Sequence, residues 1–405
     1  MNVCMLIRSY APGPEGGVEK QCRRLVAALE RQGVRCTVVT HWSRGSAPRR
    51  ERSGGARIRR AGWLGPLTRR AEELRDRVRG PKSPVQGAGA ADAGVRAGFR
   101  PLAPLRWLDR LLFMIEASAI MKRGGFDVLH VHESHWLAGF GAWVGHRYGI
   151  PVVCKESTWP ALPPAELDVP FGRVWERWRR RPWFIATGPH IRDSLLERGI
   201  AADRIFVVPN GVEIPQDTAK LESKDVLCVG NLWQGAEWKG FDVLLDAWGR
   251  VHAAEPSARL VMVGGGDAGP WQARARELGC EGSVVFEGRV EDPAPYCRQA
   301  SVFVLPSRTE GLSNALLEAQ SWGVPAVVSG IPGNRVVVEN HVNGLVVPVG
   351  DALPLAHALL KLLGEPMTRE AMGRAAQMRM RELFAMDQVA RRLEEAYRAI
   401  RRRNS

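Results

Sequence analysis

Two acidic residues eight positions apart form the clearest chemical pattern in the chain. They are Glu310 and Glu318, the ends of the segment Glu-Gly-Leu-Ser-Asn-Ala-Leu-Leu-Glu. Ser313, between them, is of the type that caps a helix N-terminus, where free N–H groups and the helix dipole favour a phosphate. Glu318 interrupts an apolar helix, and a lone buried carboxylate is costly unless donors meet it. The two hydroxyls of a ribose would supply such donors. Exposure to solvent or a structural ion pair is the alternative interpretation.

A cation and several glycines indicate further places where a phosphate could bind. Lys239 precedes an expected helix and follows a strand that ends in glycine, an arrangement that suits a diphosphate. The glycines 264–266 end another expected strand, and Gly16 and Gly17 precede the first helix. Each leaves room for a ligand to approach, and each also fits an ordinary turn. The 264–266 cluster lacks the second half of a dinucleotide-binding fingerprint.

Two histidines, His130 and His132, end an expected central strand. Strand alternation puts both on one face, with His132 outermost. We therefore expect His132 to reach a cleft at the strand ends. A purely structural role is the alternative interpretation.

The elements that must position these residues follow an α/β pattern twice. Residues 3–7, 18–33 and 35–40 read as strand, helix and strand, a βαβ unit that predicts a parallel sheet. In the second half, most expected strands run into Gly, Pro or Ser at the end where open α/β sheets bind ligands. The expected strands there are 225–230, 259–264, 283–286, 301–306, 326–329 and 344–347, and the expected helices are 240–254, 271–279 and 313–322.

A chain of 405 residues favours two domains, and the turn at Pro209-Asn-Gly indicates the junction. We predict an N-terminal domain over 1–212, a second domain over 213–380 and a last helix, 381–405, that packs back toward the first domain. Helical periodicity runs from 368 to 401. Residues 42–110 are rich in Gly, Pro and Arg, and we interpret them as a long, partly mobile insertion.

The cysteine pattern and the lack of long apolar runs predict a cytoplasmic protein. Seven scattered cysteines with no C-x-x-C pair argue against a disulfide framework or a zinc site. The sequence shows no leader-like start and no apolar run of the roughly 18–20 residues that a membrane span needs.

Basic residues are concentrated in the first half. Residues 1–215 hold 35 Lys and Arg against 20 Asp and Glu, and 42–110 alone hold 17 against 6. Such a surface suits an anionic membrane, an acidic acceptor or nucleic acid, and solvated arginines are the alternative. We expect no nucleic-acid partner, because no recognisable aromatic module is present. A peripheral site on the cytosolic leaflet is expected instead, with shallow insertion or simple packing of Leu102, Leu105, Trp107, Leu108, Leu111 and Leu112.

Taken in order along the chain, these patterns resemble the retaining glycosyltransferases of family 4. The resemblance covers nearly the whole chain outside 42–110. It rests on Gly16-Gly17-Val18-Glu19, Val131-His132-Glu133, Pro209-Asn-Gly-Val212, Lys239-Gly240, 264–266, Phe286-Glu-Gly288, Glu310 to Glu318 and Gly333-Asn334.

The resemblance implies the GT-B fold, an α/β class with two Rossmann-like, doubly wound parallel-sheet domains facing across a cleft. It also implies retaining transfer from a nucleotide-diphosphate sugar to a glycan or lipid-linked acceptor, without a metal or cofactor.

The resemblance also implies roles for individual residues. His132 would lie near the reacting sugar, Glu310 would bind the sugar's hydroxyls and Lys239 would neutralise the leaving diphosphate. Glu318 would hold the ribose. The other implied donor-binding residues are Gly16, Gly17, Asn231, Gly265, Arg289, Val290, Arg308, Gly311, Leu312, Ser313 and Asn314.

One position departs from the family pattern. Asn231 stands where the family usually has a basic residue, and losing a cation there removes stabilisation that can be worth ~3 kcal/mol of barrier. Arg308, beside Glu310, is the expected substitute. A homologue that binds nucleotide sugar without turnover, and a sugar-nucleotide epimerase or phosphorylase on the same fold, are the alternatives.

Overall fold

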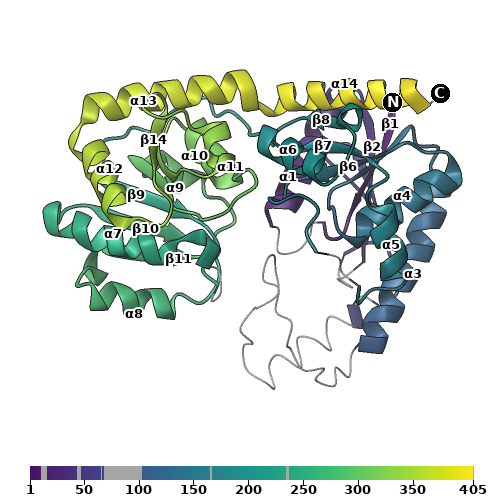
Figure 1. Ribbon diagram of the computed structural model, residues 1–405, viewed down its shortest axis with the longest axis horizontal. Helices are drawn as coiled ribbons and strands as arrows, with labels where there is room; N and C mark the ends of the chain where they lie inside the picture. Colours follow the sequence, from purple (N-terminus) through teal and green to yellow (C-terminus); the bar gives the residue numbers. More distant parts are fainter. Residues whose placement is uncertain are drawn as a thin grey trace. The chain divides into compact units, whose positions relative to one another are not determined.

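The computed structural model describes residues 1–10, 16–42, 47–64, 66–67, 103–164, 167–233 and 237–404. This part of the chain divides into two compact α/β units (Figure 1). The first comprises the described residues up to Pro209 and those from Asp387 onward, and the second comprises Asn210–Met386. The first unit is therefore built from two separate stretches of sequence.

The first unit contains an eight-stranded sheet in the order β3-β4-β2-β1-β5-β6-β7-β8. All neighbouring strands pair in parallel except β3 and β4. The run from Val3 to Ile7 is completely buried, as is typical of a strand covered on both faces. The strands are β1 (Asn2–Ile7), β2 (Arg35–His41), β3 (Arg50–Ser53), β4 (Ala56–Ala61), β5 (Val128–Val131), β6 (Val152–Glu156), β7 (Trp183–Ala186) and β8 (Ile205–Val207).

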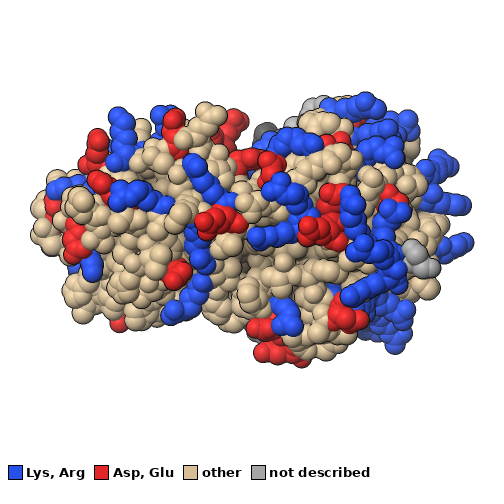
Figure 2. All heavy atoms as spheres, turned by 90° about the horizontal axis from the view of Figure 1, so that it is seen from above, with Lys and Arg blue, Asp and Glu red and all other residues tan. Residues whose placement is uncertain are grey.

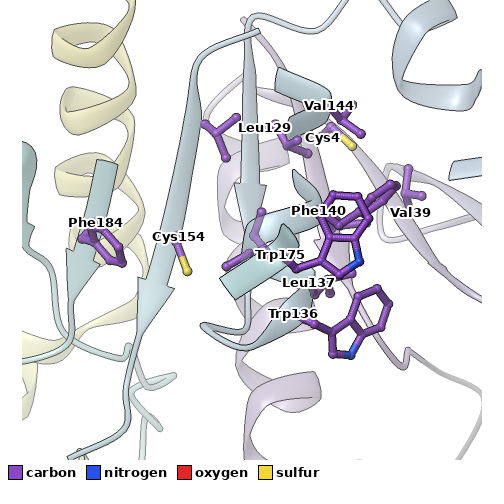
Figure 3. Close-up of a cluster of buried hydrophobic side chains, with 14 of the residues drawn as sticks. Cys4, Val39, Leu129, Trp136, Leu137, Phe140, Val144, Cys154, Trp175 and Phe184 are labelled. Atoms are coloured by element: carbon purple, nitrogen blue, oxygen red, sulfur yellow. The ribbon is translucent and has the colours of Figure 1, made fainter. Parts of the chain in front are cut away.

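Aromatic side chains of two helices fill much of this unit's core. Phe140 of α4 meets Trp175 of α5 edge to face, with ring centroids 5.7 Å apart, near Leu129 and Cys4 (Figure 3). All seven cysteines of the chain are buried and free, which agrees with the expected lack of disulfides. The described helices of the unit are α1 (Gly17–Arg31), α3 (Ala103–Arg123), α4 (Trp136–Tyr148), α5 (Gly172–Trp178), α6 (Pro189–Glu197), the short η1 (Ala202–Arg204) and α14 (Met386–Asn404).

The structure corrects part of the insertion predicted at 42–110. Strands β3 and β4 and the start of α3 lie inside that range, and β4 pairs in parallel with β2. The strand was missed because arginines alternate with Ala56 and Ile58. One of them, Arg60, is nevertheless buried and bonded to Glu51. Residues 43–46, 65 and 68–102 lie outside the described range, so the predicted mobility of this segment remains a prediction there.

The second unit is an open sheet of six parallel strands in the order β11-β10-β9-β12-β13-β14. The strands are β9 (Asp225–Val229), β10 (Arg259–Val263), β11 (Val284–Gly288), β12 (Val302–Leu305), β13 (Ala326–Ser329) and β14 (Gly344–Val347). The helices are η2 (Glu237–Lys239), α7 (Phe241–Ala254), α8 (Gly269–Glu277), η3 (Glu281–Ser283), α9 (Ala294–Gln299), α10 (Asn314–Ser321), α11 (Pro332–Val337), α12 (Ala352–Gly364) and α13 (Pro366–Arg379). The two predicted α/β units with parallel sheets are thus observed.

The helical periodicity predicted over 368–401 is not one helix. It comprises α13, a π-helical turn η4 (Met380–Phe384) and α14, with Ala385 between the last two in an extended conformation. Ala385 pairs with Val212, so the two segments that lead out of the second unit run side by side. The helix α14 then belongs to the first unit.

Candidate active site

The carboxyl ends of β9 and β12 lie side by side at the point where the strand order of the second sheet reverses. From β9 the chain adds β10 and β11 on one side, and β12 returns to pair with the other side of β9. In open α/β sheets, ligands bind at such a switch point, outside the carboxyl ends of the strands. The described residues that follow these two strands, 230–233, 237–240 and 306–313, therefore mark the candidate site.

Glycines allow the segments around this point to lie in direct contact. Gly240, the N-cap of α7, has a φ of +70°, and a Cβ there would lie 2.2 Å from the carbonyl oxygen of Pro306. At the start of α11, a Cβ on Gly333 would lie 2.2 Å from the carbonyl oxygen of Gly311. Larger residues would push these segments apart, and with them the N-termini of α7 and α10.

Lys239 and Glu310 form an ion pair across the switch point. Their Nζ and Oε1 atoms are 2.5 Å apart, and the side chains are only 15% and 13% exposed. Ser307 Oγ donates to the same carboxylate oxygen at 3.1 Å. The ammonium also lies 4.2 Å from the ring centroid of Trp238, a cation–π distance. A charge held in this partly desolvated place acts more strongly than one in water.

The N-terminus of α10 is anchored at the same edge. Ser313 caps the helix as predicted, because its Oγ accepts a hydrogen bond from the N–H of Leu316 at 3.4 Å. Asn314, the first helical residue, accepts at Oδ1 a hydrogen bond from Nδ2 of Asn210 at 2.9 Å. Leu312 and Ser313 are buried. These contacts hold in place a helix end that is suited to an anion.

Glu318 lies half-buried on α10 and close to α9. Burial and, next, the negative charge of Glu318 raise the pKa of the Cys297 thiol on α9. Full exposure to solvent, one of the two alternatives for Glu318, is therefore excluded. The structural ion pair and the ribose role stay as the two interpretations of Glu318.

The segments after β10 and β11 extend the candidate site on the far side of β9. Gly264 packs against the backbone after β9 with no space for a Cβ, and the amide of Leu232 donates to the carbonyl of Gly265 at 2.8 Å. A Cβ on Gly265 would lie 3.4 Å from that of Arg289, so these two residues are neighbours. Val290 is partly buried against the core.

Arg308, the expected substitute for the cation missing at Asn231, is bonded to α7 and to the segment before it. Its guanidinium donates two hydrogen bonds to Asp242, at 2.9 and 2.6 Å, and another to the carbonyl of Glu237. The hydrogen bond from Arg308 is the largest cause that holds the pKa of Asp242 below its ordinary value. The charge of Arg308 is thus already paired here, while Asn231 is exposed. Lys239 is also paired, with Glu310, and it is the cation that contacts Trp238.

Two family models match the chain in succession. The model of Glycosyltransferase Family 4 matches residues 15–215, and that of the glycosyl transferases group 1 matches residues 223–365. The chain belongs to the family-4 glycosyltransferases.

Similar proteins match most of the chain. A D-inositol 3-phosphate glycosyltransferase of Xylanimonas cellulosilytica is 28% identical over 82% of this chain and 88% of its own. The lipopolysaccharide core biosynthesis glycosyltransferase LpsE of Rhizobium meliloti is 24% identical over 90% of this chain and 91% of its own. The crystal structure of Anabaena HepE in complex with UDP is 18% identical, covers 98% of this chain and 100% of its own, and has a TM-score of 0.67. This likeness confirms the GT-B fold class.

In the first unit of this glycosyltransferase, local contacts explain why residue 16, Gly16, is a glycine. It is the N-cap of α1, and its N–H donates to the carboxylate of Glu19 at 3.0 Å. A Cβ on Gly16 would lie 2.8 Å from that carboxylate, which Ser9 also binds, at 2.9 Å. Gly17 is the exposed first residue of the helix. The turn is therefore shaped by the Glu19 cap.

The expectation that His132 is open to a cleft is wrong for the described structure of this unit. Its side chain is 2% exposed and stacks on His130, with centroids 4.4 Å apart. His130 Nδ1 is hydrogen-bonded to the hydroxyl of Tyr397 on α14 at 2.5 Å. Burial, followed by the charge of Lys155, lowers the pKa of His130 to about 3, and burial lowers that of His132 well below its ordinary value. Both shifts favour the neutral form of these imidazoles in the glycosyltransferase.

Sequence reasoning missed the residues that hold Lys239 and Arg308 in place. Ser307 and Asp242 carry no motif of their own, and only their pairing across the switch point reveals them. Trp238 offered a weak signal, because two tryptophans, Trp233 and Trp238, in this loop are unusual for the family. The structure brings Lys239 and Glu310 together just before the N-terminus of α10, and their roles toward a donor stay predictions.

Proposed function

We propose that this glycosyltransferase moves a sugar from a nucleoside-diphosphate sugar to an acceptor hydroxyl, with retention and without a metal. The observation that carries the proposal is the Lys239–Glu310 pair at the switch point of the second sheet. A cation and a helix N-terminus suit a diphosphate, and a neighbouring carboxylate suits sugar hydroxyls. The complex of the similarly folded HepE with UDP-glucose supports the donor class.

In the proposed reaction, the bond between the anomeric carbon and the diphosphate oxygen breaks, and its electron pair stays on the phosphate. The ammonium of Lys239 stabilises the charge that develops there. Glu310 accepts hydrogen bonds from the transferred sugar. The acceptor oxygen bonds the anomeric carbon from the same face, and its proton passes to the leaving phosphate. The configuration is then retained without a covalent intermediate.

In this proposal the chain itself supplies the positive charge, through Lys239 and the dipoles of α7 and α10. Among the described residues, no group of three or more His, Cys, Asp and Glu side chains is placed to hold a metal ion.

The test is transfer with a panel of UDP-, GDP- and ADP-sugars, first ranked by thermal shift and then assayed in EDTA. Proton NMR of the early product reads the anomeric configuration. Inverted product, or activity that needs added metal, contradicts the corresponding part of the proposal. Donor binding with no turnover for any acceptor supports the alternative, a homologue that only binds nucleotide sugar.

Replacing Glu318 by Ala should weaken nucleoside-diphosphate binding by about 1.5–3 kcal/mol, the range for hydrogen bonds to a charged group. The reason is that the ribose hydroxyls lose their carboxylate acceptor on α10. Isothermal titration calorimetry measures the change, and Glu370→Ala on α13 is a matched control whose affinity should not move. An unchanged affinity in folded Glu318→Ala would remove the ribose role.

For the acceptor, we propose a lipid-linked or other glycan presented at an anionic membrane on the cytosolic side. Lys and Arg are frequent on the face of the first unit seen at the right of Figure 2. In the first half of α3, Trp107 and Leu108 are exposed, and Ile115 is exposed farther along the helix. The alternative that the predicted residues pack on the domain therefore fails for Trp107 and Leu108, while Leu105, Leu111 and Leu112 are half-buried. Leu102 lies outside the described range.

A second exposed apolar group lies beside α3. Arg110 donates to the carbonyl of Asp168 at 3.1 Å, which joins the helix to the loop before α5. Phe171 and Val174 are exposed there, next to the exposed Arg173. Apolar side chains flanked by arginines suit shallow insertion into an anionic leaflet. In the described part of the chain, no helix is long and apolar enough to cross a bilayer.

The double variant Trp107→Ser/Leu108→Ser should bind anionic vesicles about tenfold more weakly, because two exposed apolar side chains no longer insert. Co-sedimentation with phosphatidylglycerol and phosphatidylcholine vesicles at low and high salt measures this. Met367→Ser, an exposed apolar residue of the second unit, is the control. Equal binding to both lipids, or none to either, would mean that these residues have no role in membrane binding.

A further inference from the structure

A polar and aromatic cluster lies at the carboxyl ends of β2 and β4 in the first unit. His41 ends β2, and its register partner Ala61 ends β4. Trp42 and the pair Gly62-Trp63 continue directly from these strands, and the N–H of Trp42 donates to the carbonyl of Ala61 at 2.7 Å. This edge of a parallel sheet is the one where ligands bind. None of the residues in this cluster takes part in the proposed donor chemistry.

A histidine–carboxylate pair forms the polar half of the cluster. His41 Nε2 lies 2.9 Å from Oδ2 of Asp109 on α3, and the two side chains are 18% and 6% exposed. Gly62 makes this possible, because a Cβ there would lie 3.2 Å from Nε2 and its φ is +94°. The ring of His41 also packs edge to face on Phe113, with centroids 5.5 Å apart. Despite the short distance to Asp109, Nε2 is buried without a hydrogen-bond partner among the described residues. A polar group in this state favours a ligand that carries hydroxyl groups.

An anchored yet exposed tryptophan forms the other half. Trp63 is 62% exposed, and the guanidinium of Arg49 lies 4.3 Å from its ring centroid and 5.2 Å from that of Trp42. Arg49 in turn binds both carboxylate oxygens of Glu116 on α3. Glu116 also accepts the N–H of Gly62 at 3.0 Å. The indole is thus held in place although it contributes little to the core.

We propose that His41, Asp109 and Trp63 form a carbohydrate-binding subsite for the acceptor, which rests on the proposed glycosyl transfer. A sugar ring has an apolar C–H face, which suits an exposed indole, and a rim of hydroxyls, which suits an imidazole and a carboxylate.

The local charges favour a neutral sugar over a phosphate. The cation of Arg49 is already paired with Glu116, and the carboxylates of Asp109 and Glu116 repel an anion. The inner face of α3 carries both carboxylates, and its exposed face carries Trp107 and Leu108. One helix thus serves the sugar subsite and the proposed membrane surface.

The subsite is tested by saturation-transfer difference NMR with neutral sugars at millimolar concentration. The panel contains glucose, galactose, mannose, N-acetylglucosamine and their disaccharides, and one arm contains uridine monophosphate. Ring C–H protons of at least one neutral sugar should receive saturation. The signal should fall about tenfold in Trp63→Ala, because the stacking face is removed.

The control is Trp178→Ala, because Trp178 also lies under an arginine, Arg181, at 4.5 Å but outside the cluster. Its signal should equal that of the unchanged protein. His41→Asn should lower the signal as well, and circular dichroism shows that each variant is folded.

Three results would overturn the subsite: no neutral sugar binds, the signal persists in Trp63→Ala, or uridine monophosphate binds the cluster in preference to sugars. If the proposed glycosyl transfer is wrong and the subsite is right, the experiments give another result. Sugar binding then depends on Trp63 as expected, while no nucleotide sugar is turned over.

Discussion

Lys239→Met should lower kcat by about two to three orders of magnitude, the effect of removing one preorganised stabilising group from a transition state. The ammonium sits at the switch point, where we propose that the leaving diphosphate gains charge. Arg308 cannot take over, because it is bound to Asp242 and to a backbone carbonyl. The change in kcat is measured as the rate of nucleoside-diphosphate release. The assay uses the donor that gives the largest thermal shift.

Two further variants separate catalysis from folding in this experiment. Lys224→Met removes an exposed lysine of the same unit, which pairs with Glu255, and kcat should not change. Lys239→Met leaves Glu310 without its ion-pair partner, so the double variant Lys239→Met/Glu310→Gln is included to remove that unpaired charge. If kcat is normal in folded Lys239→Met, the proposed leaving-group role is refuted.

The second large effect is a loss of stability in mild acid. Native His130 has a pKa of about 3 against an ordinary value of 6.5, so between these values the unfolded chain binds a proton that the native chain excludes. Stability rises with pH wherever the unfolded state binds more protons. The free energy of unfolding of the first unit should therefore fall by about 2 kcal/mol between pH 7 and pH 5 from His130 alone. His132 acts in the same direction.

Urea unfolding at pH 7 and pH 5, followed by hydrogen exchange of the first unit's strands, measures this loss. His130→Asn should remove about 2 kcal/mol of the pH dependence, since an amide does not titrate. His146→Asn, at the exposed end of α4, should keep it. Lys155 does not contribute to the change between pH 5 and pH 7, because its pKa of about 8 leaves it protonated in both the folded and the unfolded state below pH 7. Equal pH dependence in His130→Asn and the unchanged protein would contradict the assignment.

Local patterns were enough to predict most of the fold. The apolar run Val3–Ile7 and its counterparts in the second unit indicate buried parallel strands, because sheets covered on both faces leave no polar alternation. The cap at Ser313 could also be predicted, because its hydroxyl acts within a single turn of helix. Strand β4 was missed because Arg60, which looks like a surface residue, is buried through an ion pair with Glu51.

The errors in the candidate site arise from contacts between distant residues. His132 was expected to be open because nothing near it in sequence covers it, yet α14 buries Tyr397 against its neighbour His130. Arg308 was expected to be available because its partner, Asp242, is 66 positions away. The His41–Asp109 pair was not seen at all, since the two residues come together only when α3 packs on β2. Such pairings depend on the fold and leave no local signal.

The helix α14 also determines when the first unit can be finished during synthesis. Ribosomes make the chain from its N-terminus, so all eight strands of the first sheet emerge long before the helix that carries Tyr397. Until then, His130 lacks the tyrosine that covers it, and part of the core faces solvent. The second unit, by contrast, is one continuous stretch, Asn210–Met386, and is complete as soon as its last strand and helices emerge. The order of completion is therefore the reverse of the order of synthesis: the unit that is begun first is closed last.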